Sequence, residues 1–416
     1  MENTRKSRKN TAQNIVIVLL LVSALFLLYQ LQHLSRSGSY LALLSDTASA
    51  SPSVEQAANL PALPAPVRLA VTGTYGRYGN LGMTTTDESF AAPGNLLREA
   101  LGSAESPQPC QESDFRAALA GDSIYYDFET ALPLSVLAGF VGADAPAEQS
   151  ARRLLLSVEG ESVTLFLTDD ASYSRCSTKV ALEDLKALIG GYQLGGAAFA
   201  FELEENALSP YSLFLTEELP DYPTLSAETA SGDTEAILSA FGFTPRTKSR
   251  YMDNGTLVVM EGDRVLRLQP DGTVTYESGG AADLLIASAA EQPTAQEAAL
   301  GCFQILNRLP SGDAALYLQS LRPDGTTGWI LAFDYQIGGI PIRRGSGEPA
   351  ATVRLRGGKI DTLTFCPRQY AAGESDSLLL PLTQALAIAQ SYAGKELHIC
   401  YTDTGADTLS ASWLAE

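Results

Sequence analysis

The stretch YMDNGTLVVMEGDRVLRLQPDGTVTYES, residues 251–278, sets the fold class of this chain. Its short β-prone runs are separated by turn signals at Asn254-Gly255, Gly262-Asp263 and Pro270-Asp271-Gly272. The residues before it, GDTEAILSAFGF, predict a helix over about 234–241 that stops at the following glycine. Together the two stretches predict one helix packed on a small antiparallel meander.

The same order recurs on a larger scale toward the C-terminus. Thr294 and Glu297 have the spacing of a capping box, which predicts the start of a helix. LYLQSLRPDGTTGWILAFDYQIGGIPI then predicts a hairpin that turns at Pro323-Asp324-Gly325, and ATVRLRGGKIDTLTF predicts a second hairpin. PLTQALAIAQSYAG is a closing helix, and ELHICY is a last strand that contains His398 with a hydrogen-bonded ring. Helix plus antiparallel sheet, twice, is an α+β architecture.

A mixed α/β domain is predicted ahead of these units. ARRLLLSVEGESVTLFLTDD is a hairpin that turns at Glu159-Gly160, and VRLAVTGTYGRYGNLG, residues 67–82, is a strand that enters a glycine-rich loop. A phosphate-binding loop requires a helix directly after the glycines, and here MTTTDESF follows instead. We therefore predict a solvated loop whose Tyr75 and Tyr78 pack down on the sheet.

The N-terminus predicts a membrane anchor. Residues 15–31 are apolar apart from Ser23 and Gln30, and as a helix they span roughly 25 Å of a hydrocarbon core of about 30 Å. A cleavable signal peptide is the alternative, but its first small-x-small site, Ala48-Ser49-Ala50, lies far beyond the apolar run. Basic residues lie before the run, with no basic cluster after it, so the N-terminus is expected in the cytoplasm and the rest outside.

These signals divide the chain into six predicted parts. They are a cytoplasmic basic tail (1–14), a transmembrane helix (15–31), a stalk rich in Ser, Ala and Pro (32–65), a mixed α/β domain (66–222), a small helix-plus-meander domain (223–288) and a C-terminal α+β domain (289–416).

Charge and residue usage argue against several functions. The net charge of -20 disfavours nucleic acid and adhesion to anionic lipid. With two histidines and no HExxH or GxSxG pattern, no metal, cofactor or catalytic residue is predicted, and we expect no enzyme. The carboxylate pairs Asp127/Glu129, Asp169/Asp170 and Glu204/Glu205 are predicted to lie in solvated turns. The five cysteines leave disulfides between Cys110 and Cys176, and between Cys366 and Cys400, as open alternatives.

Two long stretches carry a resemblance to a known family. AFGFTPRTKSRYMDNGTLVVMEGDRVLRLQPDGTVTY (240–276) and FDYQIGGIPIRRGSGEPAATVRLRGGKIDTLTFCPRQY (333–370), followed by PLTQALAIA, resemble the YycH family, and the last units are similar to YycI. GRYG at 76–79 and DSIYYDFETALPLSVLAGFVG look like the first domain of clostridial members. The resemblance covers nearly the whole chain at the level of pattern, without a catalytic motif.

The resemblance implies a function outside the membrane. Members of this family are membrane-anchored accessory regulators of the cell-wall sensor histidine kinase YycG, also called WalK, in Gram-positive bacteria. The expected partners are thus such a kinase, a YycI-like protein and the membrane. The anchor is then either a passive tether or a contact for the kinase, with candidate residues Ile15, Val18, Leu21, Ser23, Ala24 and Leu28. The sign of regulation and the oligomeric state stay open.

Two other functions remain as alternatives. The repeated helix-on-meander is also compatible with a peptide-binding or protease-inhibitory module of PepSY type, for which an open edge strand is diagnostic. A small-ligand sensor instead requires an apolar cleft between domains. Four arginines, Arg343, Arg344, Arg354 and Arg356, form a candidate basic interaction patch, or a solvated strand face paired with local carboxylates.

Overall fold

The computed structural model describes residues 60–145, 149–203, 208–217, 219–229, 234–245, 249–279, 284–286, 292–389 and 391–416. The predicted tail and anchor lie outside these residues, together with Ile15, Val18, Leu21, Ser23, Ala24 and Leu28. No helix within the described ranges is long and apolar enough to cross a membrane. The last residues of the predicted stalk are packed rather than extended, since Leu60 and Leu63 are buried beside the short 3-10 helix Leu60–Ala62.

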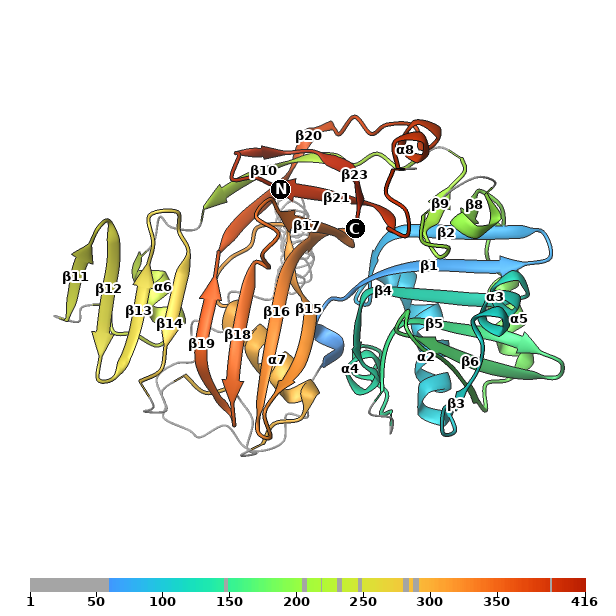
Figure 1. Ribbon diagram of the computed structural model, residues 1–416, viewed down its shortest axis with the longest axis horizontal. Helices are drawn as coiled ribbons and strands as arrows, with labels where there is room; N and C mark the ends of the chain where they lie inside the picture. The colour runs from blue at the N-terminus through green and yellow to red at the C-terminus, as the bar shows by residue number, and fades with distance from the viewer. Residues whose placement is uncertain are drawn as a thin grey trace, which may run out of the picture. The chain divides into compact units, whose positions relative to one another are not determined.

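The first domain is built on a seven-stranded antiparallel sheet with the order β2-β1-β4-β5-β6-β7-β3 (Figure 1). Its strands are β1 (Pro66–Gly73), β2 (Gly76–Thr84), β3 (Gln108–Pro109), β4 (Ser123–Pro133), β5 (Ser150–Glu159), β6 (Ser162–Thr168) and β7 (Tyr173–Ser177). The helices that go with it are α2 (Ala91–Ser103), α3 (Glu112–Ala120), α4 (Leu134–Phe140) and α5 (Leu182–Gly190).

Both faces of the central strands β1, β4, β5 and β6 are buried, which explains their apolar sequences. Leu69, Tyr126 and Leu154 face a core that includes residues of α2, α4 and α5. Their neighbours Tyr125 and Leu155 face a second core with α3 and with the hairpin of β8 (Ala197–Phe199) and β9 (Leu213–Leu215). A strand covered on both faces reads as a continuous apolar run, because neither set of alternating side chains meets water.

The glycine-rich stretch is a strand, so the prediction of a loop is wrong. Residues 76–84 pair with β1 in the register Val71↔Tyr78, and the turn lies at residues 74 and 75. Tyr75 is 88% exposed on this turn, whereas the Tyr78 ring lies 4.9 Å from that of Tyr192. Glycine is disfavoured in strands, but here the absence of a side chain permits close packing. A Cβ atom at Gly82 would lie 2.8 Å from Ile340 Cδ1, so glycine lets β2 approach the second sheet closely.

The second sheet has eleven strands and joins the two units that were predicted as separate domains. Its main path is β11 (Arg250–Asp253), β12 (Thr256–Glu261), β13 (Arg264–Leu268), β14 (Val274–Glu277), β19 (Lys359–Phe365), β18 (Ala351–Arg356), β16 (Gly328–Ile337), β17 (Ile340–Arg344), β21 (Leu397–Asp403) and β23 (Ala411–Ala415), with β15 (Ala315–Asp324) beside β16. The meander of the middle unit continues directly into the C-terminal strands (Figure 1). Tyr276 on β14 pairs with Leu363 on β19.

A third sheet also connects the predicted middle unit (223–288) with the predicted C-terminal unit (289–416). β10 (Pro223–Thr229) pairs with β20 (Arg368–Asp376) and β22 (Thr408–Leu409) in a three-stranded sheet. The remaining α-helices of the described residues are α6 (Thr234–Ala240), α7 (Ala295–Leu306) and α8 (Leu382–Ala389). The protein is therefore a mixed α/β protein dominated by antiparallel sheet, and the predicted boundary near residue 288 does not separate two sheets.

Local signals gave most turns and caps correctly. Asn254 and Gly255 both have positive φ between β11 and β12, and Gly160 has positive φ between β5 and β6. Thr294 and Glu297 form the predicted capping box of α7, with both hydrogen bonds present. The hairpin of β15 and β16 turns two residues later than predicted, at residues 325–327, since Pro323 and Asp324 still pair with β16.

Candidate functional site

A cluster of buried charges lies where the two sheets meet. Four arginines and four carboxylates contribute to it, and we call these eight residues the junction cluster: Arg68, Asp127, Glu129, Arg152, Arg153, Asp334, Arg343 and Glu396. The first five lie on β1, β4 and β5 of the first sheet. The other three lie on β16, on β17 and directly before β21 of the second sheet.

Arg68 on β1 contacts three of the carboxylates. Its guanidinium nitrogens lie 3.0 Å from Glu129, 3.0 Å from Glu396 and 3.4 Å from Asp127. Arg68 and these carboxylates are all buried. Burying an unpaired charge is costly, and a guanidinium with several fixed carboxylates meets that cost with charge-assisted hydrogen bonds.

Glu396 is the main link from the second sheet to the first. Its carboxylate also accepts hydrogen bonds from Arg152 and, at 3.2 Å, from Arg153 on β5. Backbone hydrogen bonds between residues 396 and 416 hold this position at the start of β21. The two sheets are thus tied by residues more than 240 positions apart.

A bend in β4 places Glu129 in the cluster. The pairing of β4 with β5 is interrupted between Asp127 and Leu132, and Glu129 adopts φ 66° there. Its backbone N–H donates to Asp127 Oδ1 at 2.9 Å, which stabilises this uncommon conformation. The bend brings the Glu129 carboxylate to the Tyr317 hydroxyl, which donates to it at 3.1 Å.

Arg343 completes the cluster from β17. It donates to Asp334 at 2.9 Å and to the Tyr317 oxygen at 2.6 Å, and it lies 3.4 Å from Glu129. The side chain is only 14% exposed. Arg343 therefore belongs to a buried network and not to the surface patch proposed from the sequence.

The four formal positive and four formal negative charges of the cluster balance. Burial alone would raise the pKa of Asp127, but Arg152, Arg153 and Arg68 hold it below its usual value. The pKa of Glu396 is lowered for the same reason, since the three arginines outweigh burial and the repulsion from Asp127. Burial raises the pKa of Asp334 to about 6 despite Arg343. Each carboxylate of the cluster is fixed by ion pairs with arginine. We therefore assign the cluster a structural role and not one in proton transfer.

The predicted location of one carboxylate pair was therefore wrong. Asp127 and Glu129 lie buried at the junction and not in a solvated turn. Asp169 and Asp170 follow β6 near the surface as expected, but Asp170 is also ion-paired with Arg152 and Arg153. Glu204 and Glu205 lie outside the described residues. The sequence nevertheless contains a signal for buried ion pairs. Arg152-Arg153 opens the apolar strand ARRLLLSV, and charges inside a strand that is buried on both faces require buried partners.

The other predicted arginines lie on the second sheet with partners close in the fold. Arg354 on β18 is paired with Asp324 at 2.5 Å, and Arg356 lies 3.2 Å from Asp361. Arg344 is half-buried and donates to the Pro349 carbonyl at 3.4 Å. Pairing of the strand face with local carboxylates is thus observed for Arg354 and Arg356.

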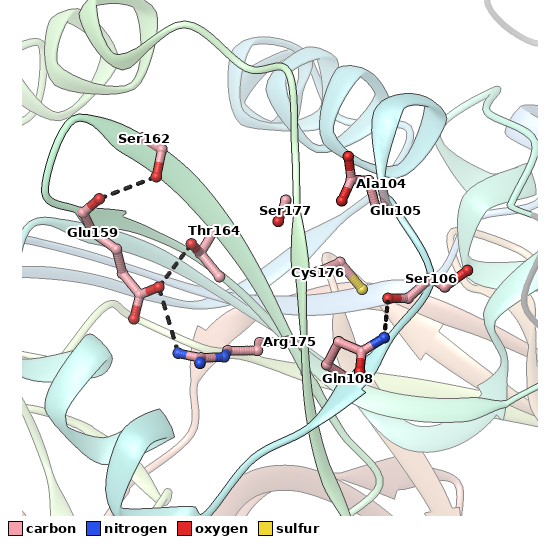
Figure 2. Close-up of a pocket in the computed structure, with 10 residues that line it drawn as sticks. All are labelled: Ala104, Glu105, Ser106, Gln108, Glu159, Ser162, Thr164, Arg175, Cys176 and Ser177. Atoms are coloured by element: carbon pink, nitrogen blue, oxygen red, sulfur yellow. Dashed lines mark hydrogen bonds and ion pairs between the residues drawn. The ribbon is translucent and has the colours of Figure 1, made fainter.

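A polar pocket of about 870 Å³ lies at the edge of the first sheet (Figure 2). Glu159 accepts a hydrogen bond from Thr164 at 2.9 Å and lies 3.9 Å from Arg175, as the dashed lines show. Cys176 also lines the pocket, and burial raises its pKa to about 11, so the thiol is protonated at neutral pH. The lining offers hydrogen bonds to a polar ligand but no activated nucleophile.

A second hollow of about 410 Å³ lies between the first sheet and the hairpin of β16 and β17. Its lining is mostly apolar and includes Tyr78, Leu81, Tyr222, Ile340 and Tyr401. The Tyr401 hydroxyl donates to the Pro223 carbonyl at 2.7 Å. This hollow has the position and character that the ligand-sensor alternative requires.

The cysteines and His398 have no catalytic arrangement. Cys110, Cys176, Cys302, Cys366 and Cys400 all have free thiols, so neither alternative disulfide is formed. His398 lies in β21 as predicted, but its Nε2 is 3.5 Å from Glu416, an ion-pair distance without the predicted hydrogen bond. Within the described ranges, no group of three His, Cys, Asp or Glu side chains is arranged to hold a metal ion.

The edge of the second sheet presents apolar side chains to solvent. Tyr251 and Met252 on β11 are 54% and 64% exposed, and Met260 on β12 is 39% exposed. β11 is the terminal strand of its sheet in the described part of the chain (Figure 1).

Comparisons with known proteins found no match: no known protein family and no curated protein is similar enough to this chain to be assigned.

Proposed function

We propose that this protein is an extracytoplasmic, membrane-anchored accessory regulator that changes the output of a sensor histidine kinase through protein–protein contacts, with a YycI-like protein as a second partner. The resemblance of residues 240–276 and 333–370 to the YycH family supports this proposal. The net charge of -20 is compatible with such a role and disfavours a nucleic-acid partner.

The observation that carries the proposal is the continuity of the second sheet. The two stretches that carry the resemblance are adjacent in it, because Val274 to Glu277 pair with Phe365 to Thr362. They form one extended surface that ends in an open strand with exposed apolar side chains. Contiguous surface of this kind is typical of proteins that act by contact.

The junction cluster favours a contact function over catalysis. Its carboxylates are the most concentrated acidic groups at the meeting of the two sheets, and each is bound by arginine. A general acid or base needs a side chain that reaches a substrate and changes protonation there. Glu396 and Glu129, which are bound by arginines of the opposite sheet, instead fix the two sheets relative to each other.

A regulator needs only a small difference in binding free energy between the two kinase states to be effective. It shifts the kinase only if it binds the two signalling states unequally, and a difference of about 1–2 kcal/mol changes the population ratio several-fold. Ordered contacts between the sheets allow one binding surface to keep a fixed geometry toward the kinase.

The apolar hollow beside Tyr78, Ile340 and Tyr401 favours a second candidate, a small-ligand sensor. In that case the ligand would bind where the two sheets meet. The regulator requires a protein partner, whereas the sensor requires a small ligand.

Crosslinking of the tagged full-length protein in its native membrane, followed by mass spectrometry, tests the proposal. We expect a sensor histidine kinase and a YycI-like protein among the most enriched partners, relative to an unrelated single-span control. Enrichment of a secreted protease, or no protein partner at all, would contradict the regulator and direct attention to the alternatives.

A further inference from the structure

Within the described residues, the backbone of β11 has one hydrogen-bonding side that no other strand pairs with. In its pairing with β12, Tyr251 is opposite Val258 and Met252 is opposite Leu257. The Met260 N–H donates to the Ser249 carbonyl at 2.9 Å, so residue 249 is on the hydrogen-bonded side of the ladder. Hydrogen-bonded pairs alternate in an antiparallel ladder. Residues 251 and 253 are therefore also bonded to β12, and the N–H and C=O groups of Arg250 and Met252 point outward.

β11 contains no proline and no bulge, two of the features that usually prevent strand addition at a sheet edge. Edge strands are commonly blocked by proline, by bulges or by charged side chains. β11 has charges at its two ends, Arg250 and Asp253, but Tyr251 and Met252 between them are 54% and 64% exposed. Leu257 is half-buried on the neighbouring strand, on the face that Met252 shares. A strand added at this edge would bury apolar surface on both faces.

We propose that β11 is a docking edge that takes an extended, acidic segment of a partner protein as an additional strand. This inference rests on the proposed function for the identity of the partner, which we take to be the extracytoplasmic part of the regulated kinase. Main-chain hydrogen bonds to Arg250 and Met252 supply affinity, and alternate side chains contact Tyr251 on one face and Met252 on the other.

Charge selects the partner segment. Arg250 is exposed on the strand, and Arg246 and Lys248, which lie outside the described residues, precede it in the sequence, so residues 246–250 are basic in a chain of net charge -20. An acidic segment is attracted to such a stretch, and complementary charge also speeds association. A second copy of this chain is the alternative occupant, and the crosslinking experiment below distinguishes it from the kinase.

The substitution Met252→Pro tests the backbone pairing. Proline removes an N–H that the protein's own ladder does not use, and prolines are tolerated at edge positions whose N–H faces solvent. The fold and the melting temperature should therefore be kept, while partner capture falls about tenfold through loss of main-chain bonding. The matched control Met252→Thr keeps the N–H and a β-prone side chain, and it should lose less capture than the proline variant.

Photo-crosslinking in the full-length protein in its native membrane identifies the occupant. A benzophenone amino acid replaces Met252, and a control protein has it at Tyr75, which is 88% exposed on the turn between β1 and β2. We expect a crosslink from position 252, but not from position 75, to an extended acidic segment of the kinase. Arg250→Glu should weaken this crosslink through charge repulsion.

The outcomes separate the docking edge from the proposed function. Kinase capture that is equal for wild type and Met252→Pro would overturn the docking edge and leave the regulator intact. A crosslink to an acidic extended segment of another protein would support the edge and contradict the kinase as partner. A crosslink to a second copy of this chain, or no crosslink from position 252, would overturn the docking edge.

Discussion

Arg68 on β1 donates a hydrogen bond to Glu396, 328 residues further along the chain, with a nitrogen–oxygen distance of 3.0 Å. Both side chains are buried, and both belong to a network that connects the two large sheets. A buried pair of this kind contributes less to net stability than its geometry suggests, because desolvation offsets the attraction. Its removal from one side only is nevertheless costly, since the remaining charge loses its partner.

Replacing Glu396 should therefore destabilise the protein strongly. Glu396→Gln leaves Arg68, Arg152 and Arg153 without one carboxylate, and we expect a loss of about 3–5 kcal/mol in the free energy of unfolding. Denaturant unfolding of the purified full-length protein measures it. The matched control is Glu277→Gln, whose pair with Arg267 is solvent-exposed and should contribute less than about 1 kcal/mol. Equal losses for the two variants would show that the cluster does not hold the sheets together.

The close approach of the two sheets depends on glycine. A Cβ atom at Gly339 would lie 2.2 Å from the Met83 backbone nitrogen, and Gly339 has φ 76°. We expect Gly339→Ala to cost at least about 1–3 kcal/mol through overpacking and backbone strain. Gly102→Ala is the control, because it lies in α2 with nothing within 4 Å of its added Cβ and should be neutral or stabilising. The change in melting temperature of each variant measures both effects.

Much of the local structure could be predicted from the sequence, because turns and helix caps depend on residues that are neighbours in the chain. Glu159-Gly160, Asn254-Gly255 and the Thr294 capping box act within a few residues, and each is found where the pattern placed it. Long-range pairing could not be predicted in this way. Nothing near Tyr276 in the sequence indicates that it pairs with Leu363, so one sheet was interpreted as two domains.

The candidate site was predicted less well for a related reason. Glycines 76, 79 and 82 indicated a loop because glycine disfavours strands, but their value lies in contact with distant elements such as Ile340. Asp127 and Glu129 indicated a solvated turn because their arginine partners lie on other strands. A charge that is neutralised only by tertiary contacts cannot be distinguished from a solvated charge without knowing those contacts.

Stability should depend on pH through Asp334. Its pKa is about 6 in the folded protein, above an ordinary value of 3.8, so folding favours the protonated form. This contribution is fully present below the unfolded pKa and is lost as the pH rises through about 6, and it amounts to about 3 kcal/mol. The pH dependence of unfolding should therefore differ between the wild type and Asp334→Asn between about pH 4 and pH 6. Parallel curves over that range would contradict the assignment.

All five cysteines should be free thiols in solution. Cys110 is half-buried and the other four are buried, and burial raises the pKa of Cys110 and of each of the others. We expect slow labelling in the native protein, led by Cys110, because the reactive thiolate is scarce at neutral pH. Titration in denaturant should give five thiols both with and without a reductant. Three or fewer without a reductant would reveal a disulfide.

The most direct test of the central claim is the autophosphorylation rate of the captured sensor kinase, reconstituted in vesicles with and without the full-length protein. We expect a several-fold change in rate that saturates with added protein, because a regulator of this kind binds the two kinase states unequally. A rate that stays unchanged at saturating protein would contradict regulation by contact, even if the two proteins bind.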